Sequence, residues 1–255
     1  MAETGDHRYA QAARFSDYFA LQLLFAEAVA RGRGEALGEV VRRFTNLHRR
    51  LALGEVDDGE PGPEWRAFAD GLEACRAHED RVAWTLAALA AAPDEPPQAT
   101  HVRFGCFAFE PPDDGLVRIH FNNRDSTPGA GPLSRARRPA RTAELSRMFA
   151  HLRGRHPDAR RVAGASWLYH TEAYRSLFPA DYVASRRIAE PVRLTGTSSW
   201  GQFLNHEGAV KHDLRAVFVG RFGEIDPAQP WTIFPLRPLA VTAPVETFYR
   251  HFGVA

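Results

Sequence analysis

The chain contains 255 residues, of which 44% are hydrophobic and 25% are charged, and its formal net charge at pH 7 is +1. This composition is typical of a globular protein with a buried core, and the near-zero charge excludes bulk electrostatic attraction to nucleic acid or to an anionic membrane. We therefore expect a small-molecule substrate and neither a nucleic-acid nor a membrane partner, while the oligomeric state stays open.

Cysteine usage and the apolar runs predict a cytoplasmic protein. Cys75 and Cys106 lie far apart and outside any metal-ligand spacing, so we expect two reduced thiols. The segment 1–15 carries acidic residues and no apolar stretch, which argues against a signal peptide. The longest apolar run, around residues 84–92, is far shorter than a membrane span.

Residues 1–98 are predicted to form a helical subdomain. Apolar side chains recur every three or four positions in the segments 15–29, 37–51 and 65–89, which is the pattern of amphipathic helices. Gln22, His48 and Glu79 interrupt these apolar stripes. Because a buried polar group needs a partner, we predict that these side chains form a structural hydrogen-bonded cluster between the helices.

From residue 99 onward the apolar period changes to two, which predicts strands. Segments 102–109 and 116–122 alternate in this way, and the turn EPPDDG between them indicates a hairpin. A helix with Leu145, Met148, Phe149 and Leu152 as its inner face follows, then a strand at RRVAGASWLY and a short helix at TEAYRSLF. Pro235 and Pro238 confine the last extended segment to a sheet edge or an irregular strand. We predict an α+β protein whose helical subdomain packs on a mixed, partly antiparallel sheet with flanking helices, and whose site lies within 99–255.

Polar residues gather where the strand 116–122 ends, in the sequence VRIHFNNRDSTPGAGPLS. Strand alternation places three polar side chains on one face and the loop continues with three more: Arg118, His120 and Asn122, then Asn123, Arg124 and Asp125. One interpretation is a solvated strand face; the other, which we favour, is a ligand site, because loops at strand ends concentrate binding groups.

The following turn and helix start are candidates for anion binding. Gly129 and Gly131 lie in the turn PGAGP, whose backbone N–H groups can face an anion, and Arg137 and Arg138 follow. The alternative interpretation is a flexible turn before a solvated helix. Further along, Trp167 and other aromatic and polar residues in GASWLYHTEAYRSLFP are typical either of a small-molecule pocket or of the edge of a core.

The histidines form no metal-binding motif, and we predict no metal. Metal sites assembled from distant residues lack such motifs, so a metal-dependent enzyme using His120 and His170 with a carboxylate remains one hypothesis. A second hypothesis is a non-catalytic module whose arginine-rich segment 135–161 binds an anionic partner surface.

The order of hairpin, glycine-containing loop, helix, strand and tyrosine-bearing helix over residues 101–190 resembles the GNAT family of acyl-CoA-dependent N-acyltransferases. The matching stretches are VRIHF, GAG, the helix through Phe149, RVAGASWLY and AYRSLFP. The chain departs from the family's loop pattern here, because four residues lie between Arg124 and Gly129 where the family has two.

This resemblance implies acyl transfer from an acyl-CoA to an amine. It places Gly129 and Gly131 in the pyrophosphate loop and makes Tyr174 the acid that protonates the thiolate. We assign His120 as the base for the acceptor amine and Arg137 and Arg138 to the anion site. The groups expected to contact substrate are Arg118, Asn122, Asn123, Arg124, Asp125, Trp167 and His170.

Overall fold

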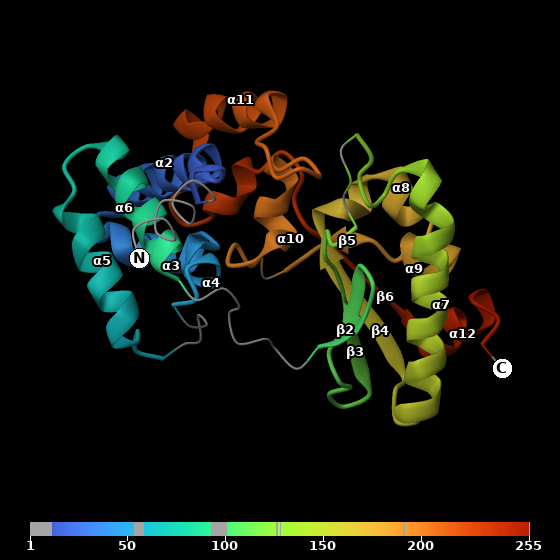
Figure 1. Cartoon of the computed structure of the whole chain (residues 1–255). Coiled ribbons are helices and arrows are strands. Elements are labelled where there is room, and N and C mark those ends of the chain that lie inside the picture. The colour runs from blue at the N-terminus through green and yellow to red at the C-terminus, as the bar shows by residue number, and fades with distance from the viewer. Residues whose placement is uncertain are drawn as a thin grey trace, which may run out of the picture. The chain divides into compact units, whose positions relative to one another are not determined.

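The computed structural model describes residues 12–53, 59–92, 101–125, 127, 129–190 and 192–254. The chain has the predicted α+β class, with a six-stranded sheet and flanking helices (Figure 1). It divides into two compact units: unit 1 comprises residues 1–97 and 192–237, and unit 2 comprises residues 98–191 and 238–255. The sequence prediction placed its boundary between 98 and 99, and it did not group 192–237 with the helical part. Within the described ranges, no helix combines the length and apolar character that crossing a bilayer requires.

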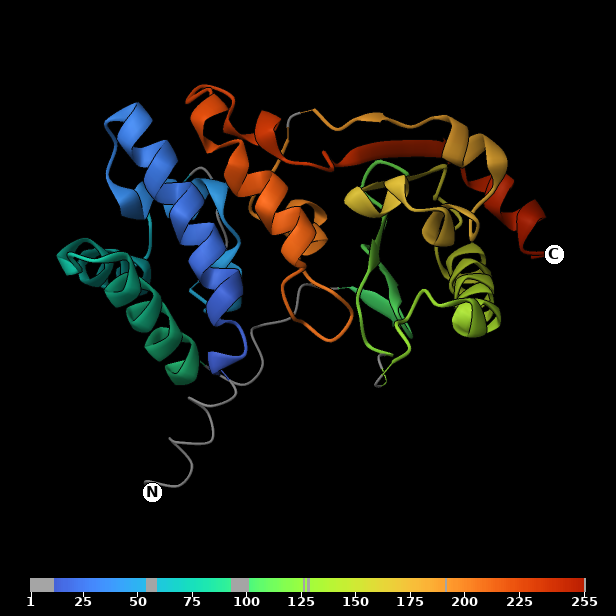
Figure 2. The same cartoon turned by 90° about the horizontal axis from the view of Figure 1, so that it is seen from above.

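Unit 1 is helical throughout its described parts. In the first segment α2 lies beside α6 and packs on α3, as Figure 2 shows. The helices of this segment are α2 (Ser16–Arg33), α3 (Leu37–Phe44), α4 (Leu47–Arg50), α5 (Pro63–Ala74) and α6 (His78–Ala91). The second segment contributes α10 (Thr197–Trp200), η3 (Gly201–Phe203), α11 (His212–Gly220), η4 (Phe222–Glu224) and η5 (Pro230–Ile233).

An aromatic cluster explains why residues 192–237 belong to unit 1. The ring of Phe25 on α2 lies 5.5 Å, centroid to centroid, from each of Trp200, Phe218 and Phe234. All four side chains are buried. Aromatic rings bury large areas and stabilise such edge-to-face contacts, so the late segment completes the core that the early helices leave open.

The polar side chains buried in unit 1 differ from the predicted cluster. Gln22 Oε1 accepts a hydrogen bond from the Asn46 backbone N–H at 3.0 Å, and Asn46 Nδ2 donates to Tyr18 Oη at 3.0 Å. His48 is buried as expected, but neither ring nitrogen has a hydrogen-bond partner among the described residues. Glu79 is exposed, so its prediction was wrong. The predicted single helix is interrupted between α5 and α6. This interruption changes the helical register, so Glu79 does not lie on the apolar stripe.

His48 is expected to make the protein acid-sensitive. Burial, with smaller contributions from the Arg49 and Arg42 charges, lowers the pKa of His48 from 6.5 to about 4. Between pH 6.5 and 4 the unfolded chain therefore binds a proton that the folded chain does not, so stability falls as the pH falls through this window. The free energy of unfolding of the parent should fall between pH 7 and pH 5, and His48→Leu should make this fall smaller by about 2 kcal/mol, as measured by urea denaturation at each pH. The same substitution at exposed His212 is the control; equal pH dependence in parent and His48→Leu would contradict this expectation.

Unit 2 holds the six-stranded sheet, in the order β1-β2-β3-β4-β6-β5. Neighbouring strands are antiparallel except β3 and β4, which are parallel. The strands are β1 (Val102–Phe104), β2 (Phe107–Phe109), β3 (Leu116–Phe121), β4 (Arg161–Ser166), β5 (Arg187–Ile188) and β6 (Leu239–Pro244). The sheet is therefore mixed and partly antiparallel, as the sequence predicted.

Two strand predictions are corrected. The segment 102–109 is not one strand, because Gly105 and Cys106 form a two-residue turn between β1 and β2. Gly105 adopts φ +63°, which a glycine at the first turn position permits. The segment with Pro235 and Pro238 is not at an edge either: β6 begins just after both prolines and pairs with β4 on one side and β5 on the other.

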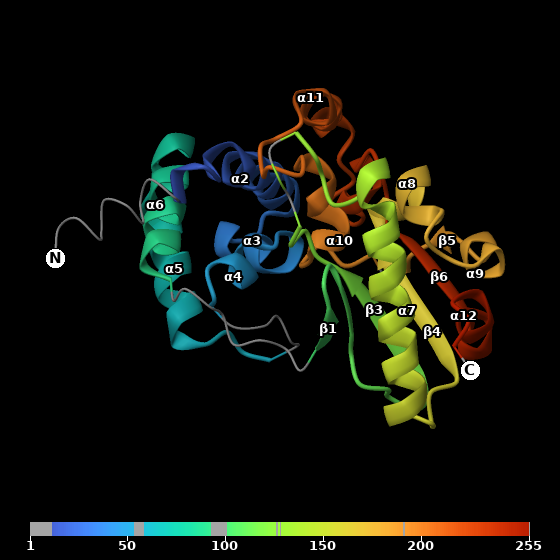
Figure 3. The same ribbon diagram turned by 45° about the vertical axis from the view of Figure 1, so that its right-hand side comes forward.

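Helices cover one face of this sheet. The long helix α7 (Arg138–Arg155) packs on β1 and β2, with α12 (Val245–His251) beside it (Figure 3). The predicted inner face of α7 is buried, namely Leu145, Met148, Phe149 and Leu152. The remaining helices of unit 2 are η1 (Arg135–Arg137), η2 (Trp167–His170), α8 (Glu172–Arg175) and α9 (Ala180–Ala184). Val117 and Ile119 of β3 are buried and Phe121 is partly buried, whereas Arg118 is exposed, so β3 alternates as predicted.

Candidate functional site

The parallel strands β3 and β4 separate at their carboxyl ends. Their ladder joins residues 116–118 to residues 161–163 and stops there, although β3 continues to Phe121 and β4 to Ser166. The crevice outside the carboxyl ends of parallel strands is where open α/β sheets bind ligands. Beyond the ladder, the backbone N–H and C=O groups on the facing edges of β3 and β4 do not pair with each other.

Three buried tyrosines lie at this separation. Tyr169 Oη and Tyr182 Oη share a hydrogen bond of 2.9 Å over Gly164 of β4, where an added Cβ would lie 2.4 Å from the Tyr169 oxygen. Tyr174 hydrogen-bonds to Tyr169, and its ring lies 5.5 Å from that of Phe121 at the end of β3. Burial, reinforced by Tyr169, raises the pKa of Tyr174 well above its ordinary value, so its hydroxyl keeps its proton.

A histidine–carboxylate pair lies on the sheet face opposite Val117 and Ile119. His120 Nε2 is 2.7 Å from Glu110 Oε1, and His101 Nε2 is 3.8 Å from the same oxygen. The two imidazole rings stack, with centroids 4.6 Å apart. Arg118 Nη1 lies 3.8 Å from the other Glu110 oxygen. Glu110 thus joins two of the predicted site residues, Arg118 and His120.

The surroundings of His120 favour a neutral imidazole. Burial lowers its pKa below the usual value; the Glu110 carboxylate opposes this effect, and the charges of His101 and Arg118 add to it. If Nε2 donates its proton to Glu110, Nδ1 carries the free lone pair, which is the form that a general base requires.

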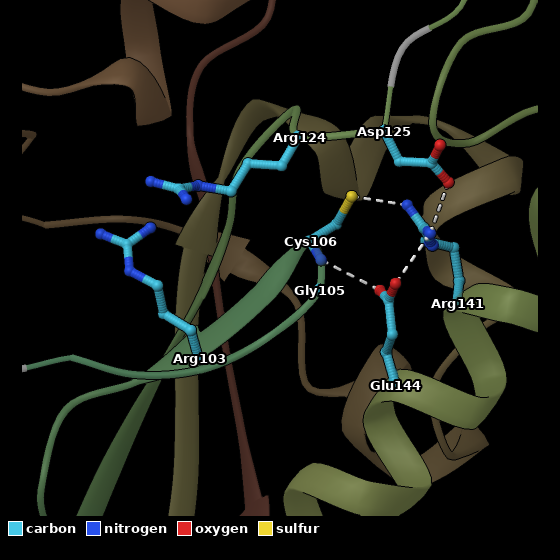
Figure 4. Close-up of a pocket in the computed structure, with 7 residues that line it drawn as sticks. All are labelled: Arg103, Gly105, Cys106, Arg124, Asp125, Arg141 and Glu144. Carbon is cyan, nitrogen blue, oxygen red and sulfur yellow. Dashed lines mark hydrogen bonds and ion pairs between the residues drawn. The ribbon is translucent and has the colours of Figure 1, made fainter.

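A pocket of about 400 Å³ lies beside the β1–β2 turn (Figure 4). It is formed by the turn, the loop after β3 and the first turns of α7. Its lining residues are Arg103, Gly105, Cys106, Arg124, Asp125, Arg141 and Glu144. Figure 4 shows that they divide into a connected group around Arg141 and a separate pair, Arg103 and Arg124.

The connected group fixes one wall of the pocket. Arg141 is 2% exposed, and its Nη2 lies 2.8 Å from both Asp125 Oδ2 and Glu144 Oε1. Glu144 Oε2 also accepts the Cys106 backbone N–H at 3.1 Å. A Cβ on Gly105 would lie 2.0 Å from Glu144 Oε1, so only glycine leaves room for this carboxylate.

The Cys106 thiol belongs to this wall. Arg141 Nη1 donates to Sγ. Burial raises the pKa of Cys106, as do the Glu144 and Asp125 charges, while the Arg124 backbone N–H and the Arg141 charge lower it. A raised pKa keeps the thiol protonated, so Cys106 is poorly suited to act as a nucleophile.

The predicted site residues fall into separate groups. Arg124 and Asp125 line the pocket, and Arg137 Nη2 lies 3.4 Å from Asp125 Oδ1. Asn122 is held beside them by its backbone N–H, which donates to the Cys106 carbonyl at 2.8 Å, and exposed Asn123 follows it. Arg138, at the start of α7, is exposed and donates to the Ser176 carbonyl at 3.2 Å, away from the pocket lining.

The other predicted residues lie outside the pocket lining. Gly129 adopts φ +77° in a turn closed by the Thr127–Ala130 bridge, a conformation that glycine permits, and Gly131 follows. Trp167 is partly buried at the start of η2, and His170 is exposed at its end.

Sequence reasoning missed the residues that complete these groups. They are His101, Arg103, Gly105, Cys106, Glu110 and Glu144, together with Arg141, which the sequence indicated only as part of the arginine-rich segment 135–161. A turn at Gly105–Cys106 would have revealed most of them, because it pairs β1 with β2 and so places His101 and Arg103 on the face of His120. The approach of Arg141 and Glu144 depends on tertiary packing and has no local signal.

Comparisons of the chain with protein-family models, with curated proteins and with solved structures identify no match.

Proposed function

We propose that the protein transfers an acyl group from an acyl-CoA to an amine. The observation that carries this proposal is the parallel pair β3 and β4, whose ladder ends while both strands continue. The pantetheine arm of CoA is an extended chain with amide groups. It can hydrogen-bond to strand backbone in the way that a peptide adds to a sheet edge. The resemblance of residues 101–190 to GNAT enzymes implies the same reaction.

The segment after β3 supplies groups suited to the phosphates of CoA. It contains the turn at Gly129 and leads into α7, whose 18 residues make a long helix with a positive N-terminal dipole. Arg137 and Arg138 lie at this helix start. Arginine suits phosphate because its planar guanidinium binds two oxygens at once.

In the proposed reaction, His120 removes a proton from the acceptor ammonium. The neutral amine nitrogen then forms a bond to the thioester carbon, the carbon–sulfur bond breaks, and the nitrogen releases its second proton to solvent, from which Tyr174 is later reprotonated. Tyr174, whose ring lies next to Phe121 at the end of β3, gives its proton to the departing thiolate. Glu110 orients the His120 ring through the 2.7 Å contact.

Replacing Arg137 and Arg138 with alanine should weaken CoA binding at least tenfold and leave the fold intact, because each charge-assisted contact to phosphate contributes roughly 1.5–3 kcal/mol. Calorimetric titration with CoA measures the change, with Arg147→Ala, an exposed arginine on the same helix, as control. A panel of acyl-CoAs and amines, followed by thiol release and product mass, tests the reaction itself. Unchanged CoA affinity would remove the assignment of these arginines.

A metal-dependent enzyme is the second candidate, because the ligand atoms of His101, Glu110 and His120 all lie within 4.8 Å of one another. Two histidines and a carboxylate are ligands typical of zinc or non-haem iron. Within the parts of the chain that the structure describes, His170 joins no such group. Elemental analysis of the purified protein distinguishes the candidates. A stoichiometric transition metal that is lost in Glu110→Gln would favour the metal enzyme over the acyltransferase base.

A further inference from the structure

Two arginines of the pocket, Arg103 and Arg124, lie apart from the network around Arg141. Among the described residues, no side-chain partner contacts the guanidinium of Arg103 or Arg124, and Arg103 Nε is buried without a hydrogen bond. Figure 4 shows both guanidinium groups on the same side of the turn, directed away from the Cys106 network. A buried donor without a partner destabilises a protein unless a ligand satisfies it, so Arg103 points to an anion that exposed Arg124, on the same side of the turn, can also contact.

The charges around the pocket support this interpretation. Asp125 and Glu144 are both committed to Arg141, and Asp125 also contacts Arg137. No carboxylate in the lining is left for Arg103 and Arg124. Two like charges on one side of a pocket repel each other, and a carboxylate or phosphate bound to both would relieve that repulsion.

Arg103 also lies on the same sheet face as the proposed base. Arg103 is opposite Ala108 on β2, and Ala108 is opposite His120 on β3. Directly opposed residues point to the same face, and two strand spacings separate Arg103 from His120 by roughly 10 Å between Cα atoms. Ala108 between them is buried, so it is the strand register and spacing that relate Arg103 to His120. An acceptor that is bound by Arg103 and spans this distance has its far end at His120.

We propose that the acceptor is an amine that also carries a carboxylate or phosphate, with the anionic group bound by Arg103 and Arg124 and the amino group directed to His120. This inference rests on the proposed acyl transfer and adds the class of acceptor. The arginines then select substrate and position it, while the chemistry occurs at the end of β3.

The test uses acceptors in matched pairs with one acyl-CoA: glycine with glycinamide, 4-aminobutyrate with its amide, and phosphoethanolamine with ethanolamine. We expect thiol release with an anionic member and at least tenfold less with its neutral partner. Arg103→Met and Arg124→Met should each lower kcat/KM for that acceptor by roughly 10- to 100-fold. Arg147→Met is the control, and each variant is also titrated with CoA.

The outcomes separate this inference from the function on which it rests. Equal turnover of anionic and neutral acceptors overturns it. Loss of CoA affinity in Arg103→Met also overturns it, because the anion would then belong to the cofactor. If no amine is acylated, the proposed function fails, and thermal unfolding with inorganic phosphate decides whether the pocket binds an anion. Phosphate should raise the Tm of the parent and of Arg147→Met but not of Arg103→Met; equal shifts in all three exclude the site.

Stability gives an independent measurement. Replacing an arginine that stabilises the fold makes the protein less stable, whereas replacing an arginine that is kept for ligand binding does not. Arg103→Met should therefore melt at or above the temperature of the parent in the absence of anions. A clear loss of stability would show that Arg103 serves the fold instead.

Discussion

Replacing Glu144 with leucine is expected to lower the free energy of unfolding by roughly 3–5 kcal/mol, because it leaves the buried Arg141 guanidinium without one of its two carboxylates. Arg141 is 2% exposed, so water does not replace the lost partner. The Cys106 backbone N–H loses its acceptor at the same time. The turn at Gly105 is thereby detached from α7.

A double-mutant cycle identifies the cause of this loss. Arg141→Met alone should be similarly destabilising, since it leaves Glu144 buried with an unpaired charge. The double variant Arg141→Met/Glu144→Leu should cost less than the sum of the single changes, because no buried charge of the pair then remains unpaired. Urea denaturation of the full chain measures all three, with Arg147→Met as the exposed control. Additive effects would contradict a direct coupling between the two side chains.

Local periodicity predicted the elements whose burial is decided by their own sequence. The apolar face of α7 and the alternation of β3 are buried as expected, because a spacing of three to four or of two fixes which side chains share a face. The hairpin between β2 and β3 was also predicted, from the turn residues between two alternating segments. The polar face of β3, with Arg118 and His120, follows from the same rule.

Features that depend on distant contacts were missed. The aromatic residues Trp200 and Phe218 complete a core begun by Phe25, and nothing near them in sequence indicates that partner. The segment with Pro235 and Pro238 was predicted to be an edge or irregular strand because proline cannot donate in a ladder, yet the strand begins just beyond Pro238 and pairs on both sides. Neither Pro235 nor Pro238 belongs to this ladder, because β6 begins at Leu239, after both prolines.

The residues of the candidate site likewise comprise some that local sequence predicted and others that depend on distant contacts. His120 and Asp125 were found because they lie in one polar stretch, whereas Arg141 and Glu144 reach the pocket from a helix that begins after an intervening loop. The turn at Gly105 was read as strand, since phenylalanines on both sides continue the alternation. Because the turn was not predicted, His101 and Arg103 were not placed on the face of His120.

Replacing His120 with alanine is expected to lower kcat/KM for acyl transfer by roughly 10²–10⁴-fold, the usual contribution of a general base. The ring lies at the sheet face and is 36% exposed, so its loss should change the Tm little. Burial lowers the pKa of His120, so the parent should lose activity only as the pH falls below the ordinary histidine range and should be fully active at neutral pH.

The two neighbours of His120 should move this acidic limb in opposite directions. Glu110 raises the pKa of His120, so Glu110→Gln should shift the limb of the kcat/KM profile to lower pH. His101 lowers that pKa, so His101→Gln should shift the limb to higher pH while retaining activity. Profiles measured with one acceptor isolate the contribution of the protein. If both variants instead lose activity together with a bound metal, the three side chains act as metal ligands, and His120 is not the base.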